Sequence, residues 1–338
     1  MDSVQALASR RLSLLGFGTY VPPVKLLSEL RMAGAPPVSH SSCWQKIAFA
    51  RDEDHPSTMA RFALERALSM ARVEPRDLSL VLSAGSTRDY PPPWSLSTQV
   101  LYEIGASQAC VGLDVMASCL GMLSALEIAR SWLWANGHGY AAIFSAERWA
   151  ATVDRNDDST LPTWGYADGA AALVISADGD DSRTIARYHR SVFANIAELN
   201  EYMIVKFGGT RFPLTPPAQE YPLARRISQR IPIEARRRMS TKTYGQVFAE
   251  IRTPISGDRE WMICTQVAPK FVRRLAEIAD IPLERVVVTG EDVGHMGGGD
   301  IVLGLQHLLD GKRQLVTGPV LMVASCPYAF GVGLLELT

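Results

Sequence analysis

The chain has 338 residues, of which 47% are hydrophobic and 20% are charged, and its formal net charge is −1. This composition is too apolar for a disordered protein, and the lack of a basic excess argues against a nucleic-acid partner. A chain of this length is expected to form two domains or one large duplicated domain.

The cysteines are scattered, without a CxxC pair or a spacing typical of metal ligands: Cys43, Cys110, Cys119, Cys264 and Cys326. This pattern favours a reducing compartment and predicts neither disulfides nor a metal site. Near the amino terminus a basic pair follows a weakly apolar stretch, which is the wrong order for a secretory signal. No apolar run approaches the roughly 20 residues that cross a bilayer. We therefore expect a cytoplasmic protein without a membrane partner.

Strand-like and helix-like runs alternate along the first half, which indicates an α/β protein. The predicted strands cover residues 12–20, 78–84, 112–116, 140–146 and 170–176. The predicted helices cover residues 55–71, 95–104 and 120–136.

The second half repeats this alternation. Its predicted strands are 261–265, 285–289, 320–325 and 331–337, and its predicted helices are 267–279 and 300–309. The strand pair 140–146 and 170–176 resembles the pair 319–325 and 331–337 in its apolar character. An internal duplication is therefore expected, with one half at residues 1–176 and the other at residues 177–338.

The segment at about residues 177–258 differs from the rest because it is rich in proline and arginine and has weak periodicity. We interpret it as a connector with insertions over the mouth of an active site, where long excursions on a rigid scaffold are common.

Cys119 follows an apolar strand-like run and small residues, and it precedes a helical pattern with apolar residues at Leu120, Leu123 and Leu126. At a helix amino terminus, backbone N–H groups and the helix dipole lower the pKa of a thiol. Such a thiolate can attack an acyl thioester and carry the acyl group. The alternative is a buried thiol that only fills the core.

Several segments together resemble the β-ketoacyl synthase III branch of the thiolase superfamily, namely residues 114–121, 165–173, 261–268, 286–295 and 325–331. This resemblance implies a five-layer αβαβα fold made of two similar halves, usually a homodimer. It also implies a soluble thioester substrate, either an acyl carrier protein or coenzyme A, and no permanently bound cofactor.

Two departures from that family bear on the reaction. Ketosynthases of the family use a cysteine with a histidine and an asparagine, which stabilise the enolate formed by decarboxylation. The resemblance places Thr265 at the histidine position and His295 at the asparagine position. Since a threonine hydroxyl cannot replace an imidazole, decarboxylative condensation is disfavoured.

Asp300 follows His295 by five residues, after three glycines, at the predicted start of a helix. It can cap that helix, or it can reach back to the imidazole and fix its tautomer. The second reading gives a nucleophile, a base and an orienting carboxylate in Cys119, His295 and Asp300.

The remaining candidates follow from the resemblance. The oxyanion donors are expected at the Cys119 backbone N–H and near Cys326, with Thr265 also in contact with the substrate. Trp44 and Lys270 lie near the expected coenzyme A or pantetheine position, although Trp44 can equally belong to the core. Asp168 is expected to be a structural turn residue.

The set of Cys119, His295 and Asp300 is similar to that of an acyltransferase subgroup in antibiotic and polyketide biosynthesis. Its members move an acyl group from a carrier protein or coenzyme A to an acceptor, often a hydroxyl. The alternatives are decarboxylating carbon–carbon condensation, starter-unit selection, thioester hydrolysis, and a non-catalytic subunit that binds an acyl carrier.

Overall fold

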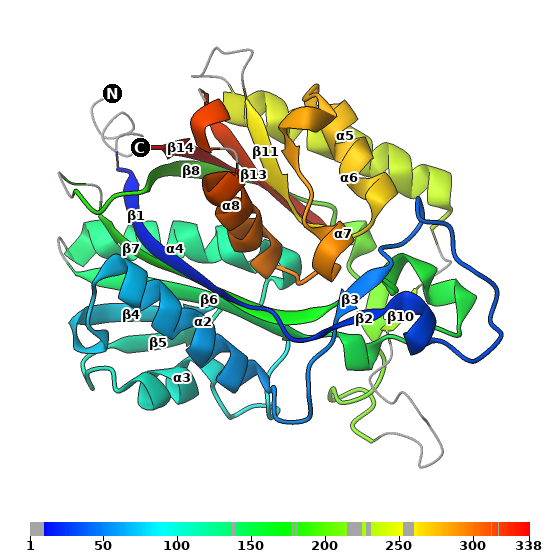
Figure 1. Ribbon diagram of the computed structural model, residues 1–338, viewed down its shortest axis with the longest axis horizontal. Helices are drawn as coiled ribbons and strands as arrows, with labels where there is room; N and C mark the ends of the chain where they lie inside the picture. Colours follow the sequence, from blue (N-terminus) through cyan, green and yellow to red (C-terminus); the bar gives the residue numbers. More distant parts are fainter. Residues whose placement is uncertain are drawn as a thin grey trace.

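The computed structural model describes residues 10–136, 139–177, 179, 182–214, 225–227, 231–252, 260–311, 313–316 and 318–338. Within these residues a ten-stranded sheet runs through the molecule (Figure 1). Its strands lie in the order β12 (Val286–Val287), β11 (Trp261–Cys264), β13 (Val320–Cys326), β14 (Ala329–Leu337), β8 (Ala186–Asn195), β1 (Leu12–Tyr20), β7 (Asp168–Ala177), β6 (Tyr140–Arg148), β4 (Leu78–Ser83) and β5 (Val111–Asp114).

The sheet consists of two arms with the same strand pattern. In one arm β1, β7 and β6 are antiparallel neighbours, and β6, β4 and β5 are parallel neighbours. In the other arm β8, β14 and β13 are antiparallel, and β13, β11 and β12 are parallel. A short antiparallel pairing between β1 and β8 joins the arms.

Helices form three layers around these arms. The central layer contains α4 (Gly121–Asn136) and α8 (Gly299–Gly311), which share one core with both arms. Outer helices α2 (Pro56–Ala71) and α3 (Leu96–Ile104) cover the β1 arm, and α5 (Ile233–Arg252) and α6 (Pro269–Ala279) cover the β8 arm (Figure 1). The result is a five-layer α/β fold, as the family resemblance implies.

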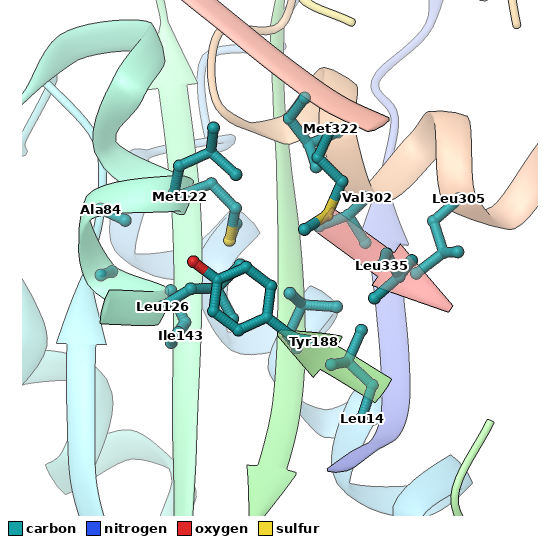
Figure 2. Packing of buried hydrophobic residues seen from close by; sticks show 14 of the residues in the cluster. Leu14, Ala84, Met122, Leu126, Ile143, Tyr188, Val302, Leu305, Met322 and Leu335 are labelled. Atoms are coloured by element: carbon teal, nitrogen blue, oxygen red, sulfur yellow. The ribbon is translucent and has the colours of Figure 1, made fainter. Parts of the chain in front are cut away.

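The central core joins side chains from both halves of the chain. Figure 2 shows Leu126 of α4 beside Tyr188 of β8, and Leu305 of α8 beside Leu335 of β14, in the same core. Full burial of each such leucine stabilises the fold by about 1.5–3 kcal/mol. The packing fixes α4 and α8 relative to each other. It therefore also fixes the relative positions of the residues at their amino termini.

Smaller elements complete the fold: β2 (Val24–Leu26) pairs with β3 (Lys46–Ala48), β9 (Met203–Val205) pairs with β10 (Arg225–Ile227), and α7 (Gly290–Val293) precedes α8. None of the helices that the structure describes is long and apolar enough to span a bilayer.

The interpretation of residues 177–258 as a connector with insertions is wrong for its described parts. These contain β8, which joins the two arms, and α5, which packs on the β8 arm. Arg190 interrupts the apolar alternation of β8, and the long, polar α5 buries few residues. Their hydrophobic signals are therefore weak. Residues 178, 180–181, 215–224, 228–230 and 253–259 lie outside the described part.

Replacement of Gly121 by alanine is expected to destabilise the fold. A Cβ atom at this position would lie 2.1 Å from the Ala84 carbonyl oxygen, so the backbone would have to move. Overpacking of this kind costs about 1–3 kcal/mol. Chemical denaturation of Gly121→Ala measures the loss, and an unchanged free energy of unfolding would refute this close approach.

Gly245→Ala is the matched control, because a Cβ atom at this position of α5 meets no other atom within 4 Å. Alanine in a helix interior is more stable than glycine by about 0.5–1 kcal/mol, so this variant should gain stability.

Candidate active site

Cys119 lies in the tight turn Ser118–Leu120, directly before α4. Ser118 has a φ of 51°, in the left-handed region, which is uncommon for a residue with a side chain. The absence of a side chain at Gly121 lets the start of α4 lie against the end of β4. The turn thus holds Cys119 at the amino terminus of the helix.

His295 lies in the loop between α7 and α8, and two glycines with positive φ shape this loop: Gly294 at 83° and Gly297 at 66°. The His295 backbone donates to the Gly165 carbonyl at 2.8 Å and accepts from the Ala167 N–H at 2.9 Å. These two hydrogen bonds attach the loop to the segment before β7. These hydrogen bonds therefore hold the loop that carries the imidazole in place.

The structure brings the three predicted residues together. Cys119 Sγ lies 3.3 Å from His295 Nε2, and His295 Nδ1 lies 2.5 Å from Asp300 Oδ2. All three side chains are buried. A nucleophile, an imidazole and a carboxylate therefore form one continuous chain of contacts.

The partners of Asp300 define the tautomer of His295. The Asp300 carboxylate also accepts the backbone N–H groups of Gln266, at 2.6 Å, and Met296, at 2.8 Å. An ionised carboxylate can only accept hydrogen bonds, so the atom that faces it must be a donor. His295 Nδ1 therefore carries the proton. Nε2 is then free to accept the proton of the Cys119 thiol.

Aromatic rings enclose the imidazole. The ring of Trp149 lies 5.3 Å from that of His295, and the ring of Tyr166 lies 4.9 Å away with its edge toward it. The Trp149 indole donates to Ser86 Oγ at 3.1 Å, and the Tyr166 hydroxyl contacts Met203 Sδ at 3.9 Å. The surroundings of Cys119 are thus largely apolar and aromatic.

Burial raises the pKa of the Cys119 thiol well above its ordinary value of 9.0. Electrostatic interaction with Cys326, Glu147 and Asp300 raises it further, whereas the hydrogen bond with Ser118 lowers it. Burial therefore outweighs any lowering by the helix amino terminus, and the net shift of this pKa is upward, opposite to the expected direction. Cys119 rests as a thiol and has to pass its proton to His295 when it attacks.

Two further buried carboxylates bind backbone N–H groups. Glu147 accepts the backbone N–H groups of Ser86 and Thr87, which hold the loop after β4. Asp168 accepts the N–H groups of Ala50 and Ala150, and burial raises its pKa to about 6. Both carboxylates therefore serve as anchors for the backbone.

Two other predicted residues, Thr265 and Cys326, lie at the ends of neighbouring strands. Thr265 is fully buried at the end of β11, and Cys326 is buried at the end of β13. Backbone N–H groups of Tyr328 and Ala329 hydrogen-bond to the Cys326 thiol, so its surroundings do contain donors.

Trp44 and Lys270 lie in different surroundings, one in the core and the other at the surface. Trp44 is buried, packs against Gly290 and donates its indole N–H to the Gln266 carbonyl at 2.5 Å. Lys270 is exposed and lies 3.4 Å from Ser42 Oγ. Trp44 is thus part of the core, one of the two readings that the sequence left open.

Gln266 is a residue that the sequence analysis did not single out. Its side-chain amide donates to the carbonyls of Cys264 and Val287 and accepts from the Gly290 N–H. It therefore connects β11, β12 and α7 while its own backbone N–H binds Asp300. An uncharged polar residue inside the apolar run 261–268 was the available signal.

No group of three or more histidine, cysteine, aspartate or glutamate side chains in the described part of the chain is arranged to hold a metal ion.

Comparison with known families shows similarity in both halves of the chain. The family model of 3-oxoacyl-[acyl-carrier-protein] synthase III matches residues 113–191, and the model of its C-terminal part matches residues 256–335. A β-ketoacyl-[acyl-carrier-protein] synthase III from Rhizorhabdus wittichii is 28% identical over 254 residues, which cover 74% of this chain and 73% of that protein. The chain is therefore similar to 3-oxoacyl-[acyl-carrier-protein] synthase III proteins over both matched regions.

Solved structures show the same fold at low sequence identity. A variant of OleA from Xanthomonas campestris has a TM-score of 0.81 and 17% identity, and the match covers 97% of this chain and 98% of that one. ChlB3, described as an "aceyltransferase", has a TM-score of 0.77 and 18% identity, and the match covers 97% and 98%. These similarities confirm the thiolase-like fold.

The raised thiol pKa predicts how alkylation of Cys119 depends on pH. Only the thiolate reacts with iodoacetamide, so the rate should increase about tenfold for each pH unit below the thiol pKa. Because that pKa lies above 9, the rate should still be rising at pH 9. Intact-mass kinetics from pH 6 to 9.5 measure it, with Cys119→Ala as the background. A rate that levels off below pH 8 would show a thiolate that is already formed at rest.

Proposed function

We propose that this protein is an acyltransferase that moves an acyl group from an acyl thioester, through Cys119, to a hydroxyl acceptor. The donor is an acyl carrier protein or a coenzyme A thioester, and the setting is antibiotic or polyketide biosynthesis in the cytoplasm, with the chain acting as a homodimer. The observation that supports this proposal is the continuous contact from Cys119 through His295 to Asp300.

In the first half of the reaction His295 Nε2 takes the proton of the Cys119 thiol. The sulfur attacks the carbonyl carbon of the donor thioester and forms a tetrahedral intermediate. When the intermediate collapses, the bond to the donor sulfur breaks, and this sulfur takes the proton from the imidazolium. The products are an acyl group on Cys119 and a free donor thiol.

In the second half the acceptor hydroxyl replaces the donor thiol. His295 removes the hydroxyl proton, the oxygen attacks the Cys119 thioester, and an ester forms as the Cys119 sulfur leaves and recovers the proton. Asp300 remains ionised and stabilises the imidazolium in each half. General-base assistance of this kind increases a rate by about 10²–10⁴.

The tautomer of His295 favours acyl transfer over decarboxylative condensation. Condensation requires hydrogen-bond donors that point at the enolate oxygen. With Asp300 on Nδ1, the neutral imidazole presents an acceptor at Nε2. An acceptor suits the removal of a proton from a thiol or a hydroxyl, and the similarity to ChlB3, described as an "aceyltransferase", is consistent with this choice.

Incubation with a panel of acyl-coenzyme A and acyl-carrier thioesters should give an intact-mass increase equal to one acyl group. Cys119→Ala should give no increase, and His295→Ala should form the adduct about 10²–10⁴ times more slowly, because it lacks the base. An acyl group that remains on Cys119→Ala would show a different nucleophile. Carbon dioxide release from a malonyl thioester would instead favour condensation.

Asp300→Asn should slow adduct formation by at least about 10²-fold, because the imidazole loses the carboxylate that fixes its tautomer. One amide oxygen also cannot serve three N–H donors, so the free energy of unfolding should fall by about 1–3 kcal/mol. Single-turnover mass kinetics and chemical denaturation measure the two effects separately. A normal acylation rate in a destabilised Asp300→Asn protein would reduce Asp300 to a structural anchor.

A further inference from the structure

Thr265 carries a buried hydroxyl without a partner. Its side chain is completely buried, and Oγ1 has no hydrogen-bond partner in the structure. Burial of a hydroxyl without a hydrogen bond is unfavourable, and native structures contain few such groups. A valine would fill the same volume without an unpaired polar atom, so packing alone does not explain the hydroxyl.

The strand pattern shows which way Thr265 faces. In β11, Trp261 and Ile263 contribute to the central core, whereas Met262 and Cys264 contribute to the outer core under α5 and α6. The Thr265 N–H donates to the Val323 carbonyl at 2.9 Å, so the ladder with β13 continues to this residue. Strand alternation therefore turns Thr265 toward the central layer, which contains α4 and α8.

The neighbours of Thr265 place it at the active site. The next residue, Gln266, donates its backbone N–H to the Asp300 carboxylate at 2.6 Å. On the adjacent strand, Cys326 faces the same central core, and β13 packs against the turn that contains Cys119. An unpaired hydroxyl donor thus lies one residue from the backbone N–H that binds Asp300, on the strand beside the one that carries Cys326.

We propose that the Thr265 hydroxyl donates a hydrogen bond to the carbonyl oxygen of the acyl thioester during attack by Cys119. This inference rests on the proposed acyltransferase function and adds a substrate-binding residue to it. A carbonyl oxygen is a hydrogen-bond acceptor, and the unpaired Thr265 hydroxyl is a donor. The two groups are therefore complementary. The hydrogen bond strengthens as negative charge develops on that oxygen, so it stabilises the transition state more than the ground state.

The test compares Thr265→Val, which removes the hydroxyl at constant volume, with Thr265→Ser, which keeps it. Thr265→Val should have an unchanged or higher Tm, because it removes an unpaired buried polar group. Its rate of acyl-enzyme formation should fall about 100- to 1000-fold, the range for loss of one oxyanion donor. Thr265→Ser should keep most of the wild-type rate.

Thr184→Val is the matched control. Thr184 Oγ1 is also buried without a partner, but the residue precedes β8 at the opposite end of that strand from the Cys326–Ala329 turn. The Tm of this variant should be unchanged or higher, and its acylation rate should not change. If Thr265→Val is not folded, the pair Thr265→Ser and Thr265→Ala provides the same comparison of hydroxyl and no hydroxyl.

The outcomes separate this inference from the proposed function. A Thr265→Val protein that is acylated at the wild-type rate overturns the role of Thr265 alone. Equal slowing in Thr265→Val and Thr265→Ser also overturns it, because shape and not the hydroxyl would then matter. A wild-type chain that takes up no acyl group from any thioester overturns the proposed function, and the role of Thr265 falls with it.

Discussion

The hydrogen bond between His295 and Asp300 determines what this site can do. It is completely buried, and Asp300 receives three N–H donors, one of them from the imidazole. An ionised carboxylate is stable in such a place because these donors compensate its lost hydration. The proton on Nδ1 leaves Nε2 as an acceptor beside Cys119. Without this bond the imidazole has no fixed tautomer, and the sulfur has no base.

The duplicated architecture places these groups together. Cys119 and His295 are 176 residues apart in the chain, and each lies just before a helix of the central layer. Because α4 and α8 share one core with both arms, their amino termini are held by rigid packing and not by flexible loops. Gln266, which follows β11, binds Asp300 through its backbone N–H. Trp44, which precedes β3, binds the Gln266 carbonyl in turn.

The sequence predicts much of this arrangement from local patterns. The alternation of β1 and the apolar runs of β4, β6 and β7 are strong signals, and the spacing of His295 and Asp300 around three glycines indicates a turn before a helix. β8 and α5 escaped prediction because charged residues mask their apolar faces. The raised thiol pKa of Cys119 and the partners of Gln266 depend on burial and on tertiary contacts, which local patterns do not contain.

The most direct test of this account is the tautomer of His295, measured by long-range ¹H–¹⁵N NMR on protein with ¹⁵N-labelled histidine. His295→Ala identifies the signal. The account predicts a proton on Nδ1 that is strongly shifted downfield by Asp300, and an unprotonated Nε2 at neutral pH. A neutral imidazole with its proton on Nε2, or a ring that exchanges between both tautomers, would contradict it.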